Sequence, residues 1–440
     1  MMKRSKPIRA AALSALAAAL LWTGAPLPVI HADSPAVSYT HWAAERIKAP
    51  MVKPQWTAAV DPGSSSAVTE GGLMLSLSGK KLIALNPANG KKVFTYGSKL
   101  KPYVKAANGR AFGIGEDGHV YAVDAKKGTA LWHTAAGVTD ADAPVVFAGD
   151  TVYVTKKNAV IALDAATGKQ RWKAVEEQAE YGGFVAMEKE GIVFVSYVLS
   201  GALSFSQVNA IDKGTGKTLW KADHHETPIA VKDGLVYTKA EPAPFGEETD
   251  TVDQTLSVLN AKTGNKTGER VYSWPKADKN SSSSVLSGSM LLDGNDLYLV
   301  TETSVSKYDF SHYEPGGKPV KKWMKPASNI SLIGSAHAGR IYFMDYDTYE
   351  VIGMKLADGQ KVGWRADNPA IQTDIYGNGV YIGQSDGVFH GYNLQTTAAA
   401  FTVQTGARDY GPTLRSGQTL LIQAKDSGKL IAVAVPKALQ

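Results

Sequence analysis

One phrase decides the fold, and it is clearest in Val160-Ile161-Ala162-Leu163-Asp164-Ala165-Ala166-Thr167-Gly168-Lys169-Gln170-Arg171-Trp172. A second copy reads Val208-Asn209-Ala210-Ile211-Asp212-Lys213-Gly214-Thr215-Gly216-Lys217-Thr218-Leu219-Trp220. Each copy joins an apolar run to an Asp, a Thr-Gly pair and a closing Trp. A phrase that recurs at a fixed spacing indicates a repeat architecture, and this conclusion precedes any other inference about the fold.

Intact or degenerate copies occupy residues 82–94, 120–132, 160–172, 208–220, 256–274, 305–323, 351–364 and 388–401. Successive copies start roughly 40 residues apart, which is typical of propeller blades. Most copies follow another short run rich in aromatic and β-branched residues. Each unit therefore predicts four antiparallel strands, A to D, with the Asp-x-x-Thr-Gly segment as the C–D turn and the Trp on strand D. The fold class is all-β, a single β-propeller.

Every residue type in the phrase has a structural role. Asp and Thr side chains can accept hydrogen bonds from turn amides, and Gly can adopt the left-handed conformation of the turn. Trp can cover the neighbouring sheet. The repeat residues that we assign to these roles are Asp124, Trp132, Asp164, Gly168, Trp172, Asp212, Gly216 and Trp220.

The two ends of the repeat array predict that the ring closes on itself. Residues 52–59 resemble a strand D with no strand C before it, and residues 419–422 and 430–433 resemble strands B and C with no D after them. Pairing the two ends would complete one more blade and remove an exposed edge. The count is then nine sheets. Because closed rings usually have about 4–8 blades, we predict eight, with one degenerate unit misread, and keep nine as the alternative.

The N-terminus predicts export. Four basic residues, Lys3, Arg4, Lys6 and Arg9, precede an apolar stretch over residues 10–22 and a small-residue cleavage site at Ala32. This is the pattern of a secretory signal peptide, and the stretch is shorter than the ~20 residues of a membrane span. We therefore expect a signal peptide over 1–32, a lead over 33–53 and the propeller over 54–440. The mature protein would be secreted or at the bacterial cell surface, a monomer without a stable membrane span.

Charge and cysteine content exclude several functions. The chain carries 47 basic and 41 acidic residues, and loss of the four leader residues leaves a net charge of +2. Such a balance does not favour nucleic-acid binding. The absence of Cys excludes thiol nucleophiles, zinc sites built on Cys and lipid attachment through Cys.

The phrase Ala-x-Asp-x-x-Thr-Gly-x-x-x-Trp resembles the tryptophan-docking repeat of the pyrroloquinoline-quinone-like β-propellers. The resemblance covers nearly the whole mature chain. That family includes quinoprotein dehydrogenases and non-enzymatic envelope proteins, among them the propeller lipoprotein of outer-membrane β-barrel assembly. The dehydrogenases hold calcium beside the quinone and often place a disulfide of adjacent cysteines against it, a feature this chain lacks. No motif here matches their calcium ligands or base.

Three polar clusters have ligand residue types but fit loops better. Residues 223–226, Asp-His-His-Glu, alternate across a strand or lie in a D–A link. Residues 345–350 place three acids in a B–C turn without the order of a calcium loop. Residues 140–142, Asp-Ala-Asp, resemble the second cluster. We predict no metal, no cofactor and no catalytic residue, with pyrroloquinoline quinone and calcium left open.

Two unusually long B–C links interrupt the repeat. Residues 198–205 form the apolar link of unit four, and residues 241–254 form the acidic link of unit five. D–A and B–C links emerge on one face of a propeller, so these two should lie side by side and could contact a partner. The candidate contact residues are Leu199, Leu203, Phe205, Phe245, Glu247 and Glu248.

The leading functional hypothesis is an exported, non-catalytic propeller that binds a cell-envelope protein or cell-wall glycan. The first alternative is a quinone- and calcium-dependent dehydrogenase of alcohols or sugars. The second is a glycan-binding or lyase-type module.

Overall fold

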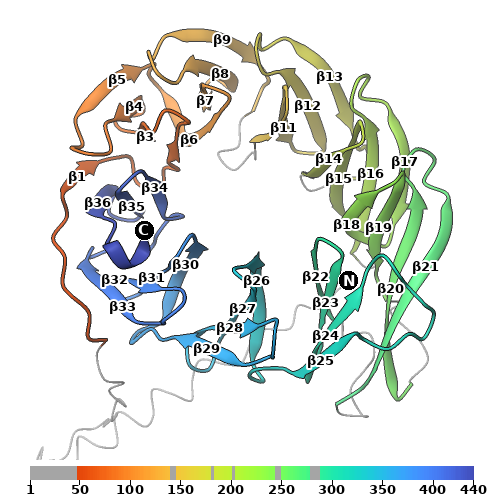
Figure 1. The fold of residues 1–440 in the computed structure, drawn as a ribbon. Helices are drawn as coiled ribbons and strands as arrows, with labels where there is room; N and C mark the ends of the chain where they lie inside the picture. Colours follow the sequence, from red (N-terminus) through yellow and green to blue (C-terminus); the bar gives the residue numbers. More distant parts are fainter. Residues whose placement is uncertain (1–46, 139–144, 180–182, 201–203, 243–248, 278–287) are drawn as a thin grey trace, which may run out of the picture. The chain divides into compact units, whose positions relative to one another are not determined.

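A computed structural model of the chain describes residues 47–138, 145–179, 183–200, 204–242, 249–277 and 288–440. These residues belong to one compact unit that spans 47–440. The predicted signal peptide and the first part of the lead, up to residue 46, lie outside the described residues. The unit consists of four-stranded antiparallel sheets that follow one another in chain order (Figure 1).

The first three blades form in simple sequence order. Blade 1 consists of β2 (Ala67–Val68), β3 (Met74–Leu77), β4 (Leu82–Leu85) and β5 (Lys92–Tyr96). Blade 2 consists of β6 (Leu100–Ala107), β7 (Arg110–Gly115), β8 (His119–Asp124) and β9 (Ala130–Ala135). Blade 3 consists of β10 (Val145–Ala148), β11 (Thr151–Lys156), β12 (Ala159–Asp164) and β13 (Gln170–Val175).

The next three blades include the longest strands. Blade 4 consists of β14 (Phe184–Lys189), β15 (Ile192–Leu199), β16 (Phe205–Asp212) and β17 (Thr218–Asp223). Blade 5 consists of β18 (His225–Lys232), β19 (Leu235–Ala240), β20 (Thr251–Asn260) and β21 (Lys266–Pro275). Blade 6 consists of β22 (Ser289–Asp293), β23 (Asp296–Val300), β24 (Ser304–Asp309) and β25 (Lys321–Met324).

The last three blades complete the ring. Blade 7 consists of β26 (Ile330–His337), β27 (Arg340–Asp345), β28 (Val351–Lys355) and β29 (Lys361–Trp364). Blade 8 consists of β30 (Ala370–Tyr376), β31 (Gly379–Gln384), β32 (Val388–Asn393) and β33 (Ala399–Gln404). Blade 9 consists of β34 (Leu414–Ser416), β35 (Thr419–Ala424), β36 (Lys429–Ala434) and β1 (Trp56–Ala59), and a 3-10 turn, η2 (Lys437–Leu439), follows.

The number of blades corrects the sequence prediction. The structure has nine four-stranded sheets, so the prediction of eight is wrong and the alternative of nine holds. The ring closes where β1 pairs antiparallel with β36, with Trp56 opposite Ala432. The repeat count of nine in the sequence equals the number of sheets. The prediction of eight was wrong because it followed the usual size of closed rings, whereas the angle between blades depends on the side chains packed between them.

The lead segment before β1 joins blade 8 to blade 9. Val52 donates its amide to the carbonyl of Thr402 in β33 over 2.8 Å, and Thr402 donates to the carbonyl of Pro50 over 2.9 Å. The amide of Ile47 lies 3.2 Å from the carboxylate of Asp367. Residues 47–52 therefore add a short strap along the outer edge of blade 8. No helix among the described parts of the chain is long and apolar enough to cross a membrane.

Tryptophans of strand D join most blades to the next, and Phe94 and Phe401 occupy the same position in blades 1 and 8. Trp132 donates its indole N–H to the carbonyl of Ala165 in blade 3 over 3.2 Å, and Trp172 donates to Lys213 in blade 4 over 2.7 Å. Trp220 makes the same bond to Ala261 in blade 5 over 2.8 Å. The apolar clusters follow this pattern, since each joins the facing sides of consecutive blades.

One degenerate copy departs from this arrangement. In blade 4, Trp220 stands opposite Ala210, but the equivalent residue of blade 5, opposite Val258, is Gly268. Trp274, which the sequence suggested as the closing Trp, lies opposite Val252 near the other end of β21. Arg270 fills the docking position instead, 4.5 Å from the ring centre of Phe310 in blade 6.

Candidate functional site

The two faces of the propeller differ in what their loops do. The A–B and C–D connections emerge on one face, which we call the turn face. The D–A and B–C connections emerge on the other, which we call the link face. Because the scaffold repeats, a functional site is expected where loops or side chains depart from the repeat.

The turn face is occupied by bonds that hold the scaffold together. Asp164 accepts hydrogen bonds from the amide of Thr167 over 2.8 Å and from its hydroxyl over 2.8 Å. Asp212 makes the same pair of bonds with Thr215. Asp124 accepts bonds from the amides of Lys126 and Lys127. These carboxylates are therefore committed to their own turns and are not available for chemistry.

The glycines of these turns lie beneath the docking tryptophans. Gly168 has φ +71° and Gly216 has φ +74°, a conformation that side chains rarely adopt. A Cβ on Gly168 would lie 2.4 Å from the ring of Trp132, and one on Gly216 would lie 2.5 Å from the ring of Trp172. Both glycines are needed for the turn and for the close approach of the neighbouring blade.

On the link face, the loops of blades 4 and 5 meet at one acidic residue. Glu241 accepts a hydrogen bond from the amide of Ser206 over 2.8 Å, and its carboxylate lies 3.4 Å from His224. The ring of Phe205 stacks on that of His224 with centroids 4.5 Å apart. The start of the blade 5 link therefore lies directly against the end of the blade 4 link.

The structure places the six candidate contact residues differently. Leu199 and Phe205 pair with each other at the ends of β15 and β16, so they are strand residues and not loop residues. Leu199 is buried in the cluster between blades 3 and 4, so it is removed from the candidate surface. Leu203, Phe245, Glu247 and Glu248 lie outside the described residues. The blade 5 link also ends earlier than predicted: β20 begins at Thr251, so residues 251–254 belong to a strand and not to the link.

More than half of the large apolar side chains exposed on the described surface lie on the link face, spread over blades 3, 4, 6, 7 and 8. Twelve are well exposed, and seven of these lie in or beside D–A or B–C links: Val175, Phe184, Val198, Met324, Tyr346, Tyr349 and Ile371. Phe184 pairs with Ser196, two residues before Val198, so Phe184 and Val198 stand on the same face of the blade 4 sheet toward its link end. We call Phe184 and Val198 the blade 4 rim. Phe205 is half-buried against the cluster between blades 3 and 4 and is not part of it. Neighbouring exposed apolar groups of this kind are typical of interaction surfaces.

A buried carboxylate, that of Glu176, bonds the D–A link between blades 3 and 4 to the strands of blade 4. The carboxylate of Glu176, in the D–A link between blades 3 and 4, accepts hydrogen bonds from Asn209 over 2.6 Å and from Lys221 over 2.9 Å. Burial acts to raise the pKa of Glu176, but the Lys221 ammonium and the Asn209 amide hold it below its ordinary value. These bonds hold the D–A link in position, and the Glu176 carboxylate stays ionised.

The residues suggested as metal ligands do not converge. His224 has φ +59° and faces Phe205 and Glu241, whereas His225 bonds to the carbonyl of Asp223 and to Ser257. Asp345 caps its own turn by accepting bonds from the amides of Asp347 and Thr348. Residues 140–142 lie outside the described residues. Within the described ranges no group of three His, Cys, Asp or Glu side chains could hold a metal ion.

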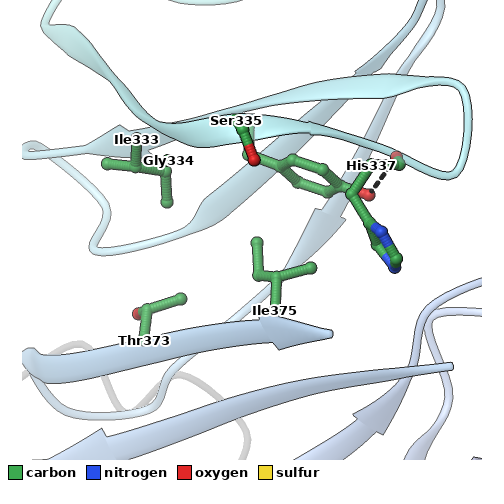
Figure 2. Close-up of a pocket in the computed structure, with 7 residues that line it drawn as sticks. Ile333, Gly334, Ser335, His337, Thr373 and Ile375 are labelled. Atoms are coloured by element: carbon green, nitrogen blue, oxygen red, sulfur yellow. Dashed lines mark hydrogen bonds between the residues drawn. The ribbon is translucent and has the colours of Figure 1, made fainter. Parts of the chain in front are cut away.

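A pocket of about 210 Å³ lies between the inner strands of blades 7 and 8. Figure 2 shows Ile333 and His337 on one side and Thr373 and Ile375 on the other. A left-handed residue, Gly334, interrupts the pairing of β26 with β27 and opens this space. The Nε2 atom of His337 lies 2.9 Å from the carbonyl oxygen of Gly377. This residue of the pocket wall therefore also connects blade 7 to blade 8.

Sequence reasoning missed a buried polar cluster in blade 8. The Nε2 atom of His390 lies 3.5 Å from Asp367, and its Nδ1 atom lies 2.8 Å from the hydroxyl of Thr402. Burial lowers the pKa of His390, although the charge of Asp367 opposes this shift. Residues 367, 390 and 402 are distant in sequence, so only the strand register, which brings them under the strap, could have revealed the cluster.

Comparison with known proteins gives one family match. The profile of the family described as outer membrane protein assembly factor BamB matches residues 116–366. The chain is also similar to polyvinylalcohol dehydrogenase of Sphingopyxis sp. (strain 113P3), with 29% identity over 178 residues that cover 35% of this chain and 25% of that protein. A second polyvinylalcohol dehydrogenase, from Pseudomonas sp, is 28% identical over 213 residues, or 43% of this chain and 29% of that protein. The chain thus covers less than a third of either relative.

Among solved structures, the chain is similar to BamB from Moraxella catarrhalis, with a TM-score of 0.48 and 14% identity. That alignment covers 86% of this chain and 96% of the other. The quinohemoprotein alcohol dehydrogenase ADHIIG from Pseudomonas putida HK5 aligns with a TM-score of 0.44 and 12% identity, over 89% of this chain and 78% of the other.

Proposed function

The chain belongs to the family described as outer membrane protein assembly factor BamB, and from that membership we propose that it is an exported, non-catalytic propeller that binds a protein at the bacterial cell envelope. The observation that supports this proposal is the pair of exposed apolar side chains of the blade 4 rim, on a face that carries seven of the twelve well-exposed large apolar side chains of the described surface. Export is part of the proposal and rests on the predicted signal peptide at residues 1–32.

The blade 4 rim has the physical properties of a contact surface. Phe184 and Val198 are each 47% exposed, yet they stand on paired strands whose backbone is fixed. A rigid apolar group loses little conformational freedom on binding, so more of its burial energy is available for affinity. Glu241 accepts a hydrogen bond from the amide of Ser206, the residue opposite Val198, and so supplies a charge beside the apolar pair, as polar groups do at the rim of a protein interface.

A matched pair of substitutions tests the proposal. Val198→Glu places a charge in the rim, and Val93→Glu places the same charge at the turn end of β5, where the Val is 49% exposed. A photo-reactive amino acid at position 198, in the native bacterium, should give a discrete cross-linked protein, and Val198→Glu should abolish co-purification of that protein. Equal loss with Val93→Glu, or no adduct at position 198 beyond that at 93, would contradict the proposal.

A second candidate function is a quinone-dependent dehydrogenase, because two relatives are named polyvinylalcohol dehydrogenases. Calcium beside a quinone needs a converging set of oxygen ligands. The described residues offer no such group of acidic or histidine side chains, so we assign no ligand and no catalytic step. Pyrroloquinoline quinone with calcium should raise the melting temperature if the folded protein binds them. A saturable increase would favour the dehydrogenase over the scaffold.

A further inference from the structure

A carboxylate and a buried imidazole face each other between blades 7 and 8 without a hydrogen bond between them. Oδ1 of Asp367, in the D–A link before β30, lies 3.5 Å from Nε2 of His390 in β32. Both atoms are buried, and neither has a hydrogen-bond partner among the described residues. The separation exceeds the ~2.7–2.9 Å of a charge-assisted hydrogen bond, so a shared proton does not account for the pair.

A buried amide side chain belongs to the same cluster. Gln384 ends β31 on the face of Ile382, which is paired with His390. Gln384 is fully buried, and neither its Oε1 nor its Nε2 atom has a hydrogen-bond partner among the described residues. Burial acts to raise the pKa of Asp367, but Gln384 and the amide of Ile47 hold it below its ordinary value, so Gln384 reaches the carboxylate. Buried polar side chains are rarely unpaired, and three of them together indicate a ligand that bonds to all three.

The equivalent position in blade 4 shows what such a carboxylate needs. By strand register, His390 stands where blade 4 has Asn209. Its partner Thr402 stands where blade 4 has Lys221. In blade 4 the carboxylate of the D–A link, Glu176, bonds to Asn209 and lies 2.7 Å from the Lys221 ammonium. Blade 4 thus neutralises its buried carboxylate with a cation of its own, whereas blade 8 has a neutral hydroxyl at that position.

The donor atoms in blade 8 fit a divalent transition-metal ion. The three side chains offer a carboxylate oxygen, an imidazole nitrogen and an amide oxygen. Imidazole suits zinc, copper, iron and nickel, whereas calcium and magnesium take oxygen ligands. Two ligands at ~2.0–2.1 Å from one zinc ion in tetrahedral geometry lie about 3.3–3.4 Å apart. The observed distance of 3.5 Å between Asp367 and His390 is close to this value.

The surrounding bonds orient these ligands. Nδ1 of His390 lies 2.8 Å from the hydroxyl of Thr402, which directs Nε2 toward Asp367, and Oδ2 of Asp367 accepts a bond from the amide of Ile47 over 3.2 Å. Metal-binding histidines are usually held through their other nitrogen in this way. Burial lowers the pKa of His390, against the charges of Asp367 and Asp386, so the imidazole is kept neutral, as a metal ligand must be. The Asp367 side chain is 14% exposed, which leaves a path from solvent.

We propose that Asp367, Gln384 and His390 bind one divalent transition-metal ion of the zinc type between blades 7 and 8, through Oδ1, Oε1 and Nε2, with the fourth position open to solvent. The ion does in blade 8 what the Lys221 ammonium does in blade 4. Through Asp367 and Ile47 it also ties the strap to blade 8. The site does not rest on the function proposed for the blade 4 rim.

Zinc binding by the metal-free full chain tests the proposal. After treatment with EDTA and dialysis, calorimetric titration with Zn²⁺ should show one site per chain. X-ray absorption at the zinc edge should show nitrogen and oxygen ligands that include one imidazole. Zn²⁺ should raise the melting temperature because it binds the folded chain, and Ca²⁺ and Mg²⁺ at the same concentration should not.

The decisive variant combines His390→Asn with Thr402→Lys and so installs the residues of blade 4. It should fold without metal, because the Lys supplies the cation, and it should bind Zn²⁺ about 100-fold more weakly or less. Thr402→Val removes only the partner of Nδ1 and should weaken binding about 10–100-fold. The matched control is His312→Asn, which removes a surface imidazole that is 83% exposed and lies 2.9 Å from Asp309. It should bind Zn²⁺ as the unmodified chain does.

Three results would overturn the proposal: no Zn²⁺ bound by the metal-free chain, equal Zn²⁺ affinity of the double variant and His312→Asn, or equal stabilisation by Ca²⁺ and Zn²⁺. Should the double variant fail to fold, a zinc spectrum without an imidazole ligand overturns the proposal on its own. Val198→Glu should leave Zn²⁺ binding unchanged, so failure here is separable from failure of the protein-binding proposal.

Discussion

Replacing Gly216 by Ala tests the account of how blades are locked together. Gly216 has φ +74°, and a Cβ there would lie 2.5 Å from Cγ of Trp172, closer than real Cβ contacts. The substitution therefore has two costs. The left-handed conformation costs about 1–2 kcal/mol for a residue with a Cβ. Displacing the Trp172 ring from a packed interface costs a further ~1–3 kcal/mol.

Gly234 separates the two costs. Its φ is also +74°, but a Cβ there would have nothing within 4 Å. Gly234→Ala therefore has the conformational cost alone. The difference in the free energy of unfolding between the two variants should be about 1–3 kcal/mol. For a unit of 394 residues with a typical unfolding entropy per residue, this corresponds to a difference of about 1–4 °C in melting temperature.

The assay is thermal unfolding followed by circular dichroism, with Trp fluorescence as a second probe. Gly216→Ala should melt below Gly234→Ala. In a Trp172→Ala background, the additional effect of Gly216→Ala should fall to that of Gly234→Ala, because no ring remains to be displaced. Equal melting temperatures for the two glycine variants in the unmodified background would refute the docking argument, since they would show that only backbone strain matters.

Two further predictions concern charge and ring closure. The pKa of Asp164 is held at about 2 by hydrogen bonds from Arg171 and Thr167, so its contribution to stability is complete above its unfolded pKa of about 3.9 and is lost as the pH falls toward 2. Asp164→Asn should lower the urea midpoint at pH 7 and flatten its decrease below pH 4, and an unchanged acid slope would contradict this origin of the shift. A chain that starts at Asp61 lacks β1 and exposes the edge of β36, so it should aggregate or melt far below a chain that starts at Lys53, which lacks only the strap. Similar melting and sedimentation of the two chains would show that β1 does not close the ring.

The architecture could be predicted from the sequence because each copy of the repeat forms its turn with residues of that copy alone. Asp164, Thr167 and Gly168 form one turn whose bonds are all local, and Trp172 needs only the next copy of the same turn. Even the closure between β1 and β36 followed from two incomplete units at the chain ends. The nine repeat units of the sequence also equal the nine blades, and the prediction of eight was wrong because the usual size of closed rings does not limit a ring whose blade angle is set by the side chains between the sheets.

The degenerate copies were harder to interpret for a related reason. Trp274 ends the fifth copy in the sequence, but a shifted register places Gly268 at the docking position. Arg270 compensates by donating to the carbonyl of Phe310 over 2.5 Å from beneath an aromatic cluster. The sequence of β21 alone does not show that Arg270 takes the place of the docking Trp, because the aromatic residue that it contacts, Phe310, belongs to the next blade.

The exposure of the candidate contact residues could not be predicted because it depends on register. Phe205 and Leu199, expected in a loop, pair with each other at strand ends and face the same cluster between blades 3 and 4, where Leu199 is buried and Phe205 half-buried. A pocket between blades 1 and 2, lined by Tyr96, His119 and His133 among others, was also missed. Its signal was present as a departure from the repeat, since Tyr121 and His119 stand where blade 3 has aliphatic residues, but it appears only when the copies are aligned by register.

The distribution of satisfied groups explains why function should be sought on the link face. On the turn face, the Asp carboxylates, the Thr hydroxyls and the Trp indoles bond within the scaffold, so a partner would have to break existing bonds to gain new ones. On the link face, Phe184 and Val198 retain exposed apolar area. Such groups gain free energy when a partner covers them, and they break no existing hydrogen bond. A repeat that commits its recurring Asp, Thr and Trp side chains to one face thus leaves the other free to differ from blade to blade, and the proposed protein-contact surface lies there.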